Sequence, residues 1–246
     1  MSNHLALRSG NPALQSSTFK NHLSSTSDGT MTLSGTVNKT AISLILVILS
    51  AGYSWSSPAM HGLVIPAALF GFILALVTVF KPTLGHITVP VYAIAQGVFL
   101  GVISMVFNAQ YPGIVVQAVF LTFGTLGALL LAYMSGLIKA TENFKLGIVA
   151  ATGGIALMYL INMVMSFFGS GISIISSNDT MGILFSGVVV VIAALNLVLD
   201  FDFIEEGAEM GAPKYMEWYG AFGLLVTLIW LYLEILRLLS KLYSRR

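Results

Sequence analysis

Five of the ten acidic side chains in this chain lie between residues 200 and 209, at the end of a long apolar segment. They are Asp200, Asp202, Glu205, Glu206 and Glu209. Carboxylate oxygens are the ligands that hard cations such as Ca2+ prefer. Neighbouring carboxyl groups can also share protons, because like charges resist joint ionisation. We therefore predict that this acidic run binds cations or protons, with Asp200 and Asp202 as the candidate Ca2+ ligands.

The spacing of the run separates one carboxyl from the other four. If the helix continues, positions 202, 205, 206 and 209 share one face, whereas Asp200 lies about 200° away from Asp202 and one turn beyond Asn196. We expect Asp200 to point into the protein together with Asn196. The remaining carboxylates would form an acidic stripe at the rim, and for the glutamates the alternative is the solvated end of a long helix.

Uncharged polar residues inside the apolar segments are the next candidates. Gln96, Asn196 and Thr227 could line a pathway, and the alternative is that they form hydrogen bonds between helices. Two further carboxylates, Glu217 and Glu234, fall in the last apolar segment, and Glu234 precedes Arg237 by three residues. We interpret these two as members of local pairs on a helix surface.

The sequence offers little for enzymatic chemistry. It has no cysteine, its four histidines are not paired at the spacing of metal ligands, and no glycine loop with a lysine is present to bind phosphate. We predict that the protein is not an enzyme and has no cofactor, unless Ca2+ is a transported or regulatory ion. A net charge of +1 gives no reason to expect a nucleic-acid partner.

Composition indicates what must position these residues. Of 246 residues, 57% are hydrophobic and 9% charged, far fewer charges than the roughly 25% of soluble domains. The chain is therefore predicted to contact the lipid bilayer as an all-α membrane protein. Seven apolar segments are long enough to cross about 30 Å of hydrocarbon. They lie near residues 38–55, 61–80, 88–107, 113–135, 144–168, 181–203 and 216–239.

The two ends of the chain differ from these segments and from each other. Residues 1–36 are rich in Ser, Thr and Asn, so we predict a polar, partly disordered tail ahead of a transmembrane domain at 37–242. The lysines outside the C-terminal tail fall on one side when the seven segments are threaded alternately, which places the N-terminus in the cytoplasm. Arg237, Lys241 and the last two arginines then lie outside, and the alternative is that the last segment enters the membrane and returns without crossing.

Four stretches of the chain resemble the Bax inhibitor-1/YccA family, specifically a long bacterial branch. They are NPAL (11–14), MTLSGTVNKTA (31–41), YAIAQGVFLG (92–101) and LDFDFIEEGAEMGAPKYMEWYGAFGLLVTLIWLYLEILRLL (199–239). The resemblance implies a seven-helix bundle in the bacterial inner membrane, with the last helix near the centre. Family members include pH-sensitive calcium leak channels and a modulator of a membrane-bound protease.

The site of the channel-type members carries over only in part. Asp200 or Asp202 matches their aspartate near the end of helix six, but Thr227 stands where helix seven should supply a second aspartate. Their early-helix arginine has no counterpart, because the chain has no arginine between Arg8 and Arg237. The resemblance thus implies either a pH-sensitive calcium leak pathway or a non-transporting regulator that binds another membrane protein, such as a protease.

Overall fold

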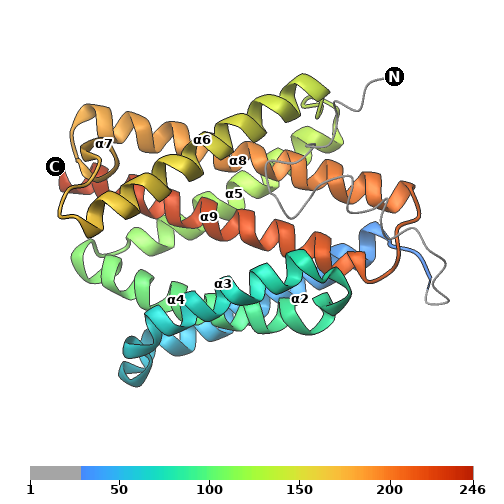
Figure 1. Ribbon diagram of the computed structural model, residues 1–246, viewed down its shortest axis with the longest axis horizontal. Helices are drawn as coiled ribbons and strands as arrows, with labels where there is room; N and C mark the ends of the chain where they lie inside the picture. The colour runs from blue at the N-terminus through green and yellow to red at the C-terminus, as the bar shows by residue number, and fades with distance from the viewer. Residues whose placement is uncertain (1–28, 246) are drawn as a thin grey trace. The chain divides into compact units, whose positions relative to one another are not determined.

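The computed structural model describes residues 29–245, and this part of the chain is almost entirely helical (Figure 1). Its long helices are α2 (Leu33–Ser56), α3 (Val64–Phe80), α4 (Gly85–Gln110), α5 (Ile114–Met134), α6 (Glu142–Phe167), α8 (Thr180–Glu209) and α9 (Met216–Ser244). Short helices lie between some of them: η1 (Pro58–Leu63), η2 (Pro82–Leu84) and α7 (Ser173–Ser176). Across residues 29–245, seven helices are long and apolar enough to cross a membrane, which confirms the predicted fold class.

The predicted polar tail is wrong in its last residues. Helix α2 already begins at Leu33, where the Thr32 side chain caps it by accepting a hydrogen bond from the Gly35 N–H (3.0 Å). Just before it, Met31 is buried and donates its N–H to the Ala212 carbonyl (2.7 Å). Hydroxyl side chains make this stretch look like a linker, but Thr is also a favoured helix cap. The rest of the predicted tail, residues 1–28, lies outside the described residues.

The chain divides into two compact units. Among the described residues, unit 1 comprises 111–201 and 227–245, and unit 2 comprises 29–110 and 202–226. Helices α8 and α9 therefore each contribute residues to both units, the larger part of each helix to unit 1. This division matters for the site, because it separates Asp200 in unit 1 from the rest of the acidic run in unit 2.

Of the seven spans, α9 is the most buried. Within its most apolar stretch, 61% of the residues are buried, against 44% for α8 and 11% for α6. Large side chains that point outward from α3, α5 and α6 include Phe70, Phe72, Phe120, Leu131 and Leu157. Such faces are suited to lipid, where apolar surface carries no cost of exposure.

In unit 2, two glycines let α4 approach α2 closely. A Cβ built on Gly97 would collide with the Ser50 hydroxyl and would lie 2.5 Å from the Val47 carbonyl oxygen. A Cβ on Gly101 would collide in the same way with the Ser54 hydroxyl and the Ala51 carbonyl. Small residues at these positions serve close helix packing, as is common in membranes.

We predict that Gly97→Ala destabilises the protein, by about 1–3 kcal/mol, because the added methyl group meets backbone on α2. The matched control is Gly127→Ala in α5, where a Cβ would meet nothing within 4 Å. There the helix propensity of alanine should leave stability unchanged or raise it by up to about 1 kcal/mol. Thermal unfolding of the purified proteins in detergent measures the difference. Equal stability of the two variants would show that α2 and α4 do not depend on this contact.

Candidate functional site

Asp200 is the most unusual polar residue of the described chain. It lies on α8 with none of its surface exposed, among the equally buried Leu197 and Leu199. Neither of its carboxyl oxygens has a hydrogen-bond partner within residues 29–245. The Thr227 hydroxyl of α9 is near enough to interact with the carboxyl, but the geometry falls short of a hydrogen bond. A buried carboxyl without a partner is costly and is a sign of function at membrane depth.

Asn196 lies one turn before Asp200 on α8 and is almost fully buried. Its amide donates hydrogen bonds to the Thr152 hydroxyl of α6 (2.8 Å) and to the Ile192 carbonyl (2.8 Å). The first of these bonds joins two helices, which is the alternative role that the sequence left open for Asn196. Asp200, Asn196 and Thr227 thus form one polar group in unit 1.

The other four carboxylates occupy a different environment. The helix does continue to Glu209, so their predicted shared face exists. Asp202, Glu205 and Glu206 are half-buried, and Glu209 is exposed. Within residues 29–245, no group of three or more His, Cys, Asp or Glu side chains is arranged to hold a metal ion. The five carboxylates therefore do not converge on one ion, because a single helix points Asp200 and Asp202 in directions about 200° apart.

Gln96 does not belong to the same unit as Asp200, Asn196 and Thr227. It belongs to unit 2, where its half-buried side chain packs on Gly71 of α3. A Cβ built on Gly71 would lie 2.5 Å from the Gln96 side-chain nitrogen, so the glycine lets the amide keep its present position. This contact joins α3 and α4 and gives Gln96 a packing role.

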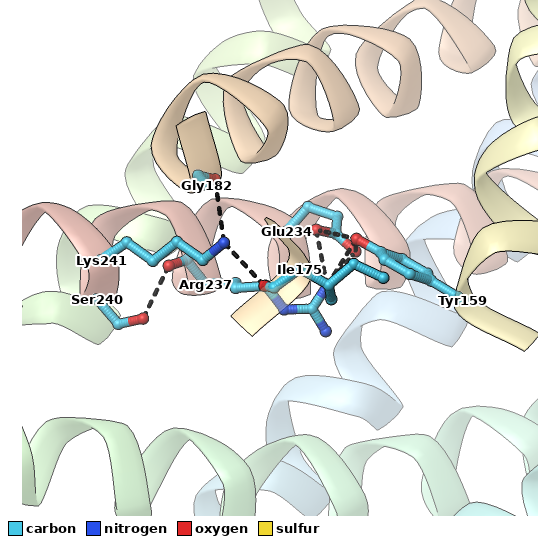
Figure 2. Close-up of polar contacts among 7 residues, drawn as sticks. All are labelled: Tyr159, Ile175, Gly182, Glu234, Arg237, Ser240 and Lys241. Atoms are coloured by element: carbon cyan, nitrogen blue, oxygen red, sulfur yellow. Dashed lines mark hydrogen bonds and ion pairs between the residues drawn. The ribbon is translucent and has the colours of Figure 1, made fainter. Parts of the chain in front are cut away.

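A second polar cluster lies toward the end of α9 (Figure 2). The Glu234 carboxylate is 2% exposed and accepts hydrogen bonds from the Tyr159 hydroxyl of α6 (3.0 and 3.1 Å). It also accepts bonds from Arg237 (3.0 and 3.1 Å), whose guanidinium donates to Tyr159 as well (2.7 Å). The predicted local pair is therefore real, but it is buried and a third side chain from another helix completes it.

Lys241 completes this end of α9. The sequence suggested only a basic tail, but the Lys241 side chain is buried, with 3% of the residue exposed. Figure 2 shows its ammonium group between two backbone carbonyls, those of Ile175 (2.8 Å) and Gly182 (3.0 Å). One signal could have found it: Thr227, Glu234 and Lys241 are seven residues apart, so they share one helix face.

Glu217 forms an ion pair across unit 2 rather than the predicted local pair. Its carboxylate pairs with Lys39 of α2. It also accepts hydrogen bonds from the Thr32 N–H (3.0 Å) and the Thr32 hydroxyl (2.9 Å). Lys39 further lies over the Trp218 ring, 5.6 Å from its centre. Local spacing could not reveal this pair, because 178 residues separate its members.

We predict that Lys39→Met lowers the free energy of unfolding by about 3 kcal/mol, because it leaves the buried Glu217 carboxylate uncompensated. The double variant Lys39→Met/Glu217→Gln should recover most of the loss, since no charge then remains. Lys139→Met, at an exposed position, is the matched control. Thermal unfolding in detergent compares the four proteins. If Lys39→Met and Lys139→Met unfold alike, the pair does not hold α2 to α9.

One of the comparisons with known proteins identifies a family. A sequence model of the family described as Bax inhibitor 1 like matches residues 11–244. Comparisons with curated proteins and with solved structures returned no match. The matched range covers the seven spans and both polar clusters of unit 1.

Proposed function

Since the chain belongs to the Bax inhibitor 1 like family, we propose that this multispan membrane protein is a pH-sensitive leak pathway for Ca2+ that passes the Asp200 carboxyl. The observation that carries the proposal is the complete burial of Asp200 without a hydrogen-bond partner in the described chain. The resemblance stated above matches Asp200 or Asp202 with the helix-six aspartate of the channel-type members, and of these two residues Asp200 is the buried one.

The chemistry of the site supports a link between cation flux and pH. An ionised carboxylate in an apolar surrounding needs compensation, and no basic side chain of the described residues bonds to Asp200. A proton or a cation can supply it, so the two should compete for the same oxygens. Thr227, in place of a second carboxyl, makes this a site with one carboxylate where the channel-type members have two.

We predict that Asp200→Asn lowers Ca2+ flux through liposomes containing the purified protein several-fold. The substitution keeps the shape of the side chain and removes its charge. Glu209→Gln is the matched control, because it removes a charge from an exposed position on the same helix, and it should leave the flux unchanged. Acidification should raise the Ca2+ concentration needed for half-maximal flux in the native protein but not in Asp200→Asn. Thr227→Asp should make the pH response steeper, since it adds a second carboxyl beside the first.

Equal flux and equal pH response in the native protein and Asp200→Asn would remove Asp200 from the proposal. A regulator that binds another membrane protein, such as a protease, would then be the better reading. The open glycines on α5 and α6 favour that reading, because another helix could approach closely there. They are Gly124, Gly127, Gly153 and Gly154, where an added Cβ would meet nothing within 4 Å.

We also propose that the protein lies in a bacterial inner membrane with its N-terminus in the cytoplasm, which the distribution of lysines supports. Because the chain has no cysteine, single cysteines can report the orientation. We predict that a membrane-impermeant maleimide labels Asn178→Cys in intact cells, and Lys81→Cys only after permeabilisation; both positions are exposed. Labelling with the opposite pattern would reverse the orientation.

A further inference from the structure

One face of α9 carries buried polar side chains along the part of the helix that belongs to unit 1. It begins with Thr227 beside Asp200 and continues through Glu234 to Lys241, with each of the three at most 3% exposed. Steps of seven residues keep them within about 20° of one line, and each step advances about 10.5 Å. We call these three residues the polar face of α9. A path that leads outward from Asp200 would therefore have polar side chains along one side.

The middle position of the polar face is compensated. The Tyr159 hydroxyl and one guanidinium nitrogen of Arg237 each lie within hydrogen-bond distance of both Glu234 oxygens, which satisfies the carboxylate. The Arg237 guanidinium also lies over the Tyr159 ring, 5.1 Å from its centre. Because 39% of the Arg237 side chain is exposed, this counter-charge reaches the surface while its partner stays inside. The carboxylate at this position therefore needs no bound ion in the structure described.

The last position resembles an occupied cation site. The Lys241 ammonium donates to the Ile175 carbonyl of α7 and the Gly182 carbonyl of α8 (Figure 2). A third oxygen group, the Asp179 carboxylate, interacts with Lys241 electrostatically. Hydrogen bonds from the Ser177 hydroxyl and the Gly182 N–H hold the pKa of Asp179 below its usual value, so this group is ionised at neutral pH. Backbone carbonyls and carboxylates are the ligands that hard cations use.

We propose that Lys241 is a tethered cation that closes the outer end of the leak pathway by occupying the carbonyl oxygens of Ile175 and Gly182. When the ammonium is absent, these oxygens and Asp179 bind Ca2+ in its place. The closure rests on the proposed function, whereas the exchange of an ammonium for Ca2+ does not. A competing account is that Lys241 merely clamps the segment between α6 and α8 onto α9.

The test compares Lys241→Met with Arg245→Met, which removes the same charge from an exposed position at the same end. Ca2+ flux into liposomes should rise several-fold in Lys241→Met and stay unchanged in Arg245→Met. The double variant Lys241→Met/Asp200→Asn should fall back to the flux of Asp200→Asn. Lys241→Gln is the second variant if Lys241→Met does not fold, because its amide can still donate to the carbonyls but carries no charge.

Hydrogen exchange at residues 168–182 provides a readout that does not need flux. Exchange should speed up in Lys241→Met, and added Ca2+ should slow it again, whereas Ca2+ should have no effect in the native protein. Faster exchange that Ca2+ does not reverse would leave only a clamp and overturn the cation site. Unchanged flux in Lys241→Met, with reduced flux in Asp200→Asn, would overturn the closure but keep the leak pathway. If Asp200→Asn has no effect on flux, the proposed function fails, and exchange alone decides the cation site.

Discussion

The structure depends on the cost of holding charge away from water. Three of its buried ionised groups have partners: Lys39 for Glu217, Arg237 and Tyr159 for Glu234, and two carbonyls for Lys241. In each case at least one partner comes from a different helix or segment, so the contact joins parts of the chain that are far apart in the sequence. Such contacts are expensive to break, because the group that remains would lose its partner inside the protein. Asp200 has no such partner in the described chain, and this difference is the reason to look for its function.

The two units also differ in the kind of charged and polar groups that they hold. Unit 2 holds the pair that fastens the start of α2 to the start of α9, together with most of the acidic run. Unit 1 holds Asp200 and the polar face of α9. The first arrangement joins helices, and the second places polar groups in a line. The proposed function therefore belongs to unit 1, where the Asp200 carboxyl has no hydrogen-bond partner among the described residues.

The sequence predicted the features that depend on local pattern. The length of the apolar segments revealed the seven spans. The positions of Asp200 and Asp202 around the helix separated the two residues, and in the structure Asp200 is buried and Asp202 is half-buried. Features that depend on distant contacts escaped. Nothing near Glu217 in sequence points to Lys39, and nothing near Lys241 points to the carbonyls of residues 59 and 66 positions away. The hydroxyl-rich start of α2 cannot be told from a polar tail by composition, because Ser and Thr are common both in linkers and at helix caps.

The pairing of Lys39 with Glu217 has a consequence for biosynthesis. The two residues are 178 positions apart, and at about 5–20 residues per second a ribosome needs roughly 9 to 36 seconds to reach the second after the first. During that interval α2 exists without its counter-charge. Its lysine has to remain at the water interface, where a long side chain can extend its charge to the surface. The ion pair that joins the start of α2 to the start of α9 can therefore form only after Glu217 has been synthesised.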